Sequence, residues 1–135
     1  MDKAVERKFV NTFIQERLQE RIIGELASAK KRQKAISRFC HTTDDIVKPQ
    51  YILNKSNKLN SDTIMETIRK MTELTSCYVI SFDKEIDGQG MTISQALQHC
   101  IGLGMPSIII IGEQIAIIET EQETGASTKY LLHAI

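Results

Sequence analysis

The sequence predicts an α+β (α/β) fold in which N-terminal helices pack on a small mixed β-sheet. Apolar residues recur at three- and four-residue spacing up to about residue 74, and short β-branched runs separated by glycine-containing turns follow. The 135 residues, 41% of them hydrophobic and 25% charged, suffice for one folded core. We therefore expect a single domain over 1–135, mainly helical over 1–75 and β-α-β-β-β over 76–135.

The first half of the chain predicts three helices. The first spans about 3–26, because apolar residues from Phe9 to Leu26 recur at helical spacing. The second follows Ser28, a residue type that caps helix N-termini, and ends near His41. An irregular connection with one short turn or strand near 51–53 leads to a third helix over 61–74.

The second half predicts four strands and one helix. The strands are expected over 77–82, 107–111, 115–118 and 127–133, where β-branched and aromatic residues concentrate. Thr92 and Gln95 have the spacing of a capping box, and Gly102 and Gly104 end the helix that this box begins. Gly112-Glu113 predicts a two-residue hairpin loop. The long connection between the first two strands suggests a right-handed parallel crossover, which would make the sheet mixed.

The charges are balanced overall but unevenly placed along the chain. Seventeen basic residues match seventeen acidic residues, which removes the whole-protein argument for nucleic acid or an anionic membrane. Residues 1–41 hold ten Lys and Arg against five acids, whereas residues 71–135 hold two Lys against eight acids. The neutral total therefore conceals a dipolar chain.

Three features predict a cytosolic location. The charged stretch from Met1 to Lys8 lacks the apolar core of a secretory signal. The most apolar stretch, 108–118, is far shorter than the roughly 20 residues that cross a bilayer. Three cysteines at wide spacing indicate reduced, buried thiols, without a disulfide framework or a zinc site.

Two groups of acidic residues are candidates for binding a partner. They are Asp83, Glu85 and Asp87 in the loop after the first strand, and Glu119, Glu121 and Glu123 at alternate positions after the hairpin. The first group resembles half of a calcium loop, but Ser94 stands where a bidentate Glu would be needed. The second group would project from one face if its strand stays extended. We expect a docking surface for a basic protein, provided that both groups lie at one edge; a solvated strand face is the alternative.

Two other interpretations stay open. The basic helix over 28–41 could bind the phosphates of a nucleic acid. Its candidate anion-binding residues are Lys30, Lys31, Arg32, Lys34, Arg38 and His41. The clustered carboxylates with Lys129 could instead hold magnesium in a metal-dependent phosphodiesterase, although the acid-x-Lys spacing of restriction-type nucleases is absent. No complete catalytic constellation, metal-ligand set or nucleotide fingerprint is present, so we expect no catalytic residue, metal or cofactor.

Two stretches of the sequence carry a resemblance to known proteins. They run from Glu20-Arg21 through Lys30-Lys31-Arg32 to Arg38-Phe39-Cys40-His41, and from Gly104-Met105-Pro106-Ser107-Ile108 through Glu119 to Tyr130-Leu131-Leu132. They resemble a largely uncharacterised group of small, single-domain bacterial proteins. Some proteins of this kind are immunity partners in contact-dependent growth inhibition, which bind and neutralise a toxin. The resemblance implies a bacterial cytosolic origin and transfers no site residues.

This resemblance agrees with the acidic clusters. Toxin nucleases bind polyanions and are usually basic, so clustered carboxylates on an inhibitor speed association and add specificity. We therefore expect a non-enzymatic binding protein, an immunity-type inhibitor, whose partner is a basic toxin domain and not a nucleic acid or a membrane. The sequence leaves the oligomeric state open.

Overall fold

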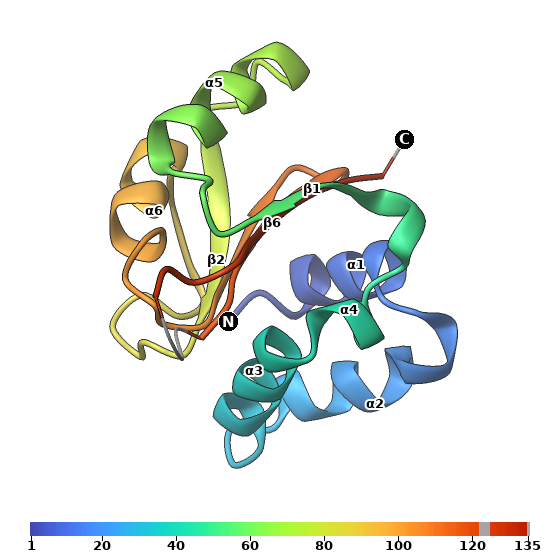
Figure 1. The fold of residues 1–135 in the computed structure, drawn as a ribbon. Coiled ribbons are helices and arrows are strands. Elements are labelled where there is room, and N and C mark those ends of the chain that lie inside the picture. Colours follow the sequence, from blue (N-terminus) through green and yellow to red (C-terminus); the bar gives the residue numbers. More distant parts are fainter. Residues whose placement is uncertain (122–124, 135) are drawn as a thin grey trace.

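A six-stranded sheet with helices on both faces forms the fold in the computed structural model, which describes residues 1–121 and 125–134 (Figure 1). The strand order is β1-β6-β5-β4-β2-β3, and all neighbouring strands are antiparallel. The strands are β1 (Ile52–Ser56), β2 (Ser76–Ser81), β3 (Gln89–Thr92), β4 (Ser107–Ile111), β5 (Ile115–Glu119) and β6 (Lys129–His133). The helices are α1 (Lys3–Phe13), α2 (Glu16–Ala27), α3 (Arg32–His41), α4 (Thr43–Ile46), α5 (Ser61–Met71) and α6 (Ile93–Cys100), with a short 3-10 helix at Pro49–Tyr51. The predicted α+β class, with helices before strands, is confirmed.

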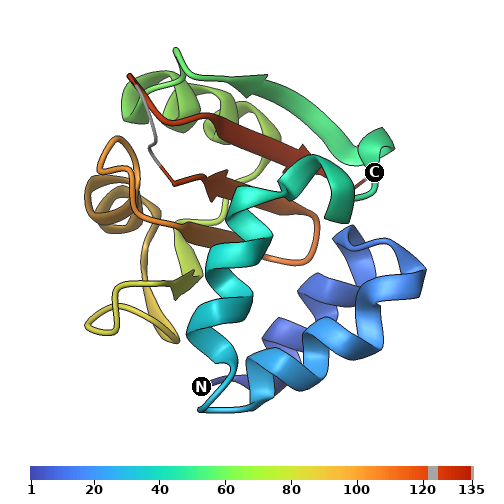
Figure 2. The same ribbon diagram turned by 60° about the horizontal axis from the view of Figure 1, so that its bottom comes forward.

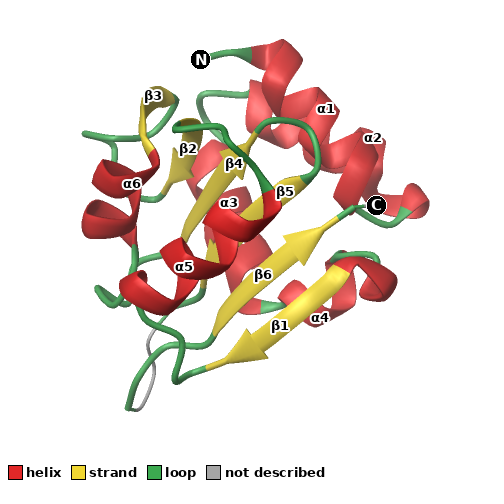
Figure 3. Ribbon diagram, turned by 90° about the horizontal axis from the view of Figure 1, so that it is seen from above, coloured by secondary structure: helices red, strands yellow, loops and turns green. Residues whose placement is uncertain are grey.

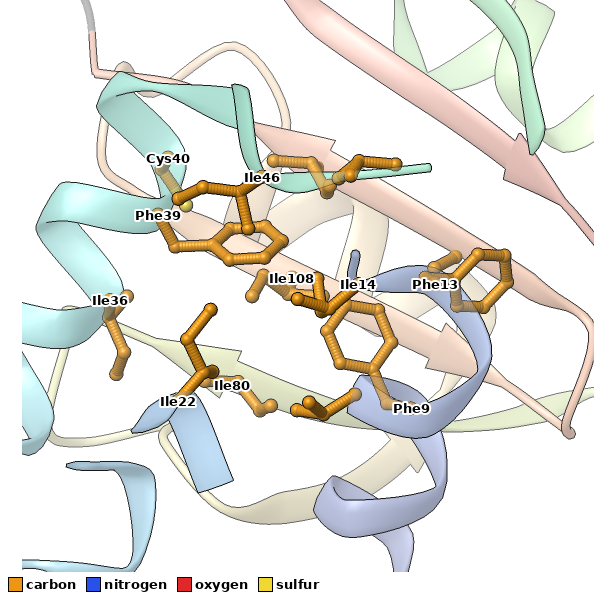
Figure 4. Packing of buried hydrophobic residues seen from close by; sticks show 14 of the residues in the cluster. Phe9, Phe13, Ile14, Ile22, Ile36, Phe39, Cys40, Ile46, Ile80 and Ile108 are labelled. Carbon is orange, nitrogen blue, oxygen red and sulfur yellow. The ribbon is translucent and has the colours of Figure 1, made fainter. Parts of the chain in front are cut away.

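The sheet lies between two helical layers. Helices α1 to α4 cover one face, and α5 and α6 cover the other (Figures 1 and 2). Successive residues of a strand point to opposite faces, so Ile108 packs against the first layer and Ile109 against the second. On the first face, Phe9 and Phe39 lie over Ile108, with their ring centroids 6.0 Å apart (Figure 4). The run 107–111 is buried on both sides, as its composition predicts.

The expected first helix is two helices, α1 and α2. Ile14 takes an extended conformation and forms a β-bridge with Val47, while the Phe13 carbonyl accepts a hydrogen bond from the Lys48 N–H at 2.8 Å. These contacts with a distant segment replace the helical bonds that would continue α1. The apolar periodicity runs through the break because both helices bury their faces in the same core.

The strand pairing shows that the predicted parallel crossover is wrong. Ile80 pairs with Ile108 in an antiparallel ladder, so β2 and β4 run in opposite directions (Figure 3). The cause is β3, an unpredicted strand that pairs with β2 and turns the chain back before α6 begins. The predicted capping box is present, because the Thr92 Oγ1 accepts from the Gln95 N–H and the Gln95 side chain accepts from the Thr92 N–H, both at 3.1 Å.

Several boundaries differ slightly from the expectation. The hairpin forms, but its loop has three residues, because Ile111 pairs with Ile115. Helix α3 begins at Arg32, since the Ser28 carbonyl first accepts the N–H groups of Lys31 and Arg32 in a turn. Helix α5 ends at residue 71, and the strand expected near 51–53 extends over 52–56.

The expected burial of the three cysteine thiols is confirmed. Cys40, Cys77 and Cys100 are free and buried, as expected for core residues. Among the described residues, no helix has both the length and the apolar character that a bilayer span requires.

Candidate functional site

The two predicted acidic segments lie at the same end of the sheet. Strands β2 and β5 both end there and are separated only by β4, which places their ends about 10 Å apart. Ser81, Ser107 and Glu119 face one another in register across these three strands. The Phe82 N–H also donates to the Pro106 carbonyl at 2.9 Å, so the start of loop 82–88 meets the end of loop 101–106.

The predicted docking residues divide into those that reach the surface and those that turn inwards. Glu85 and Glu121 are exposed, and Asp83 is half-buried. The side chain of Asp87 is only 7% exposed, and Glu119 is fully buried. Neither Asp87 nor Glu119 presents its carboxylate to a partner, which corrects the expectation that both contact it directly.

Glu119 binds the loop between α6 and β4. Its Oε2 atom accepts from the Gly102 N–H at 2.9 Å, the Gly104 N–H at 3.1 Å and the Ser127 Oγ at 3.0 Å. Both glycines have positive φ, a conformation that side-chain-bearing residues rarely adopt and that lets both amides converge on one oxygen. The Oε1 atom is buried and has no hydrogen-bond partner among the described residues.

The expected alternation of the three glutamates does not extend past β5. The strand ends at Glu119, and the next acidic residue, Glu121, lines a polar cavity of about 270 Å³ together with Cys40 and His41 of α3. Glu119 instead faces the α5–α6 side of the sheet, alongside Ile115 and Ile117. The third residue of the set, Glu123, lies outside the described residues.

Asp87 is bound by a buried arginine. Arg32 donates from Nε to Asp87 Oδ2 at 2.7 Å and from Nη2 to Asp87 Oδ1 at 2.9 Å. The same guanidinium donates to the two carboxylate oxygens of Glu6 at 2.6 and 2.7 Å, and to the Leu26 carbonyl at 3.0 Å. Burial alone would lower the pKa of Arg32, but the hydrogen bonds and charges of Asp87 and Glu6 outweigh it and raise the pKa above its usual range.

This ion-pair network joins four parts of the fold. Tyr78 of β2 donates to Glu6 Oε2 at 2.6 Å and accepts from the Asp2 N–H at 3.0 Å. Burial and the bond to Glu6 raise the pKa of Tyr78 to about 12. The Ser81 N–H donates to Asp87 Oδ1 at 3.0 Å. Helices α1 and α3, strand β2 and loop 82–88 are thereby held together.

The structure places the predicted anion-binding residues of α3 in separate environments. Arg32 is internal, and Arg38 forms an ion pair with Glu25 of α2. His41 lines the polar cavity beside β6. These residues therefore do not form one phosphate-binding face with the exposed lysines.

The exposed lysines Lys30, Lys31 and Lys34 lie at the start of α3. The Gln33 side chain donates to the Phe82 carbonyl at 2.9 Å, which places this helix start beside loop 82–88. Basic residues from the first half of the sequence and acidic residues from the second half therefore lie at the same end of the sheet.

Three large apolar side chains are exposed on the two adjoining loops. Phe82 is 38% exposed, Leu103 64% and Met105 41%. Sequence reasoning missed them because it placed Phe82 in the first strand, which ends at Ser81, and because isolated apolar loop residues such as Leu103 and Met105 carry no periodic signal. We call this region the sheet-end surface, defined by Phe82, Asp83, Glu85, Leu103, Met105 and Glu121.

The described residues do not group any three His, Cys, Asp or Glu side chains as metal ligands. Burial raises the pKa of Cys100 to about 11 and that of Cys77 to about 12. Burial likewise raises the pKa of Cys40 above its usual range. All three thiols are therefore held in the protonated, weakly nucleophilic form near neutral pH.

Comparisons with models of protein families, with curated proteins and with solved structures found no match to this chain.

Proposed function

We propose that this chain is a cytosolic, non-enzymatic binding protein that docks a protein partner on the sheet-end surface. The observation that carries the proposal is the exposure of Phe82, Leu103 and Met105 on two loops that are hydrogen-bonded to each other. Aromatic and methionine side chains are enriched in the buried centres of protein interfaces. Phe82 and Met105 are of these types, and Leu103 adds apolar area at the same end of the sheet, so that together they supply the apolar centre that a docking surface needs.

The surrounding charges favour a basic partner. Asp83 and Glu85 lie in the loop that carries Phe82, and Glu121 follows β5 at the same end of the sheet. A basic protein would be attracted to them from a distance and would lose this attraction as salt is added. The lysines at the start of α3 restrict the docking orientation, because the partner's basic groups must face away from them.

We further propose that the partner is a bacterial toxin domain and that the chain acts as its immunity-type inhibitor. The resemblance to immunity proteins and the basic character of toxin nucleases support this choice. An inhibitor of such an enzyme needs no chemistry of its own, because covering a polyanion-binding surface excludes the substrate.

The test compares two charge-reversal variants in affinity capture from the native host. The first carries Asp83→Lys, Glu85→Lys and Glu121→Lys. The control changes charge equally at exposed acids away from the sheet end, and carries Glu66→Lys, Glu73→Lys and Glu113→Lys. The control should melt close to the parent, because exposed substitutions usually change stability by less than about 0.5 kcal/mol. The first variant should stay folded with a somewhat larger loss, because Asp83 is half-buried and accepts a hydrogen bond from the Glu85 N–H.

The parent and the control should retain one stoichiometric basic protein that the first variant loses. Adding the parent to that purified protein should abolish its nuclease or other toxic activity. Equal retention by both variants would contradict docking at the sheet-end surface. Retention of nucleic acid, lost on Lys30→Ala with Lys31→Ala and Lys34→Ala, would favour the nucleic-acid interpretation.

A further inference from the structure

The two buried carboxylates at the sheet end hold the two loops that carry the exposed apolar side chains. Glu119 binds amides on both sides of Leu103, at Gly102 and Gly104. Asp87 closes loop 82–88 by accepting from the Ser81 N–H, at the point where the chain leaves β2 toward Phe82. Each carboxylate thus fixes the backbone next to a residue of the sheet-end surface.

The two anchors lie in the interior, where they are protected from water. Glu119 is fully buried, and the side chains of Asp87 and Arg32 are 7% and 6% exposed. Hydrogen bonds to ionised groups are stronger than neutral ones, and a low-dielectric interior strengthens them further. The loops are also tied to each other through the Phe82 N–H and the Pro106 carbonyl.

We propose that Asp87 and Glu119 are positioning residues that hold loops 82–88 and 101–106 in the conformation that receives the partner. This inference rests on the proposed function. A loop that is already ordered loses less entropy on binding, so the anchors strengthen docking without touching the partner.

The two anchors should respond differently to amide substitution. All three hydrogen bonds to Glu119 end on Oε2, and Oε1 has no partner among the described residues. The carbonyl of Glu119→Gln can therefore replace Oε2. Both oxygens of Asp87 accept bonds, so the amide group of Asp87→Asn must face the guanidinium of Arg32 or the Ser81 N–H. Glu119→Gln should therefore preserve the conformation of loop 101–106, whereas Asp87→Asn should disturb that of loop 82–88.

The first measurement is residue-resolved hydrogen exchange of the free protein, compared with amides of β4 and β5. In Glu119→Ala, the amides of Gly102 and Gly104 should exchange about tenfold faster or more, while the Ile109 amide changes less. Glu119→Gln should restore slow exchange. Asp87→Asn should speed exchange at Ser81 and its loop. Unchanged loop exchange, or an equal increase throughout the sheet, would overturn the positioning role.

The second measurement is the affinity of each variant for the basic protein captured by the parent. The dissociation constant should rise about tenfold in Glu119→Ala and return toward the parent value in Glu119→Gln. Unchanged affinity despite an opened loop would overturn the inference while leaving the proposed function intact. Capture of no protein by the parent would refute the proposed function and the docking role, and the exchange data would still decide whether the carboxylates order the loops.

Discussion

Replacing Arg32 with methionine should strongly destabilise the fold. Arg32 donates five hydrogen bonds, four of them to the carboxylates of Glu6 and Asp87. Its removal leaves two negative charges in the interior, where the side chain of Glu6 is 6% exposed and that of Asp87 7%. Breaking a buried ion pair from one side costs about 3–5 kcal/mol, a large part of the roughly 5–15 kcal/mol of a typical domain.

The assay is urea unfolding followed by far-ultraviolet circular dichroism. Lys31→Met is the matched control, because it removes one positive charge at the exposed neighbouring position and should change the free energy of unfolding by less than about 0.5 kcal/mol. Adding Glu6→Gln and Asp87→Asn to Arg32→Met should recover much of the loss, since no charge is then left buried. A loss below about 1 kcal/mol in Arg32→Met would refute the view that this network stabilises the fold.

Three further predictions concern Tyr78, the three cysteines and Ile110. Because burial and the bond to Glu6 raise the pKa of Tyr78 to about 12 from an unfolded value near 10, its stabilising contribution is full below pH 10 and disappears toward pH 12. Tyr78→Phe should remove this component from the pH dependence of unfolding. A thiol reagent at pH 8 should label none of the three cysteines until the protein unfolds, since burial raises the pKa of each, that of Cys100 to about 11. Ile110→Asp, a charge at a position 4% exposed, should cost more than about 4 kcal/mol and lower the melting temperature markedly.

Periodicity predicted the elements whose apolar residues meet the core, and it failed where distant contacts determined the backbone. The run 107–118 and the Thr92 capping box are local signals, and both appear in the structure. The break at Ile14 depends on Val47, more than thirty residues away. Strand β3 contains Gly90 and mostly exposed residues, so no alternating apolar pattern marks it.

The sequence also contained signals for the two inward-facing groups. Glu119 continues the alternation of Ile115 and Ile117, which face the α5–α6 layer. Its side chain is therefore expected to point inwards. Arg32 precedes Ala35 and Ile36 at helical spacing and therefore belongs to the buried face of α3. Their partners could not be predicted, because Arg32 lies 26 residues from Glu6 and 55 from Asp87 along the chain.

The exposed part of the site depends on how the loops are folded. The acidic residues of loop 82–88 were visible in the sequence, but the adjacency of Phe82 to Pro106 arises from the pairing of β2 with β4. The same pairing joins the loop that carries Leu103 and Met105 to the start of loop 82–88. The sequence alone does not reveal such a surface, since each of these residue types is common in loops.

If a protein partner docks on the sheet-end surface, hydrogen exchange of the complex should locate it there. The parent is compared free and bound to the basic protein that it captures. We expect slowed exchange in loops 82–88 and 101–106, with α5 and the β4–β5 hairpin at the opposite end unchanged. Protection confined to α5 and α6, or to the start of α3 without either loop, would contradict docking at the sheet-end surface.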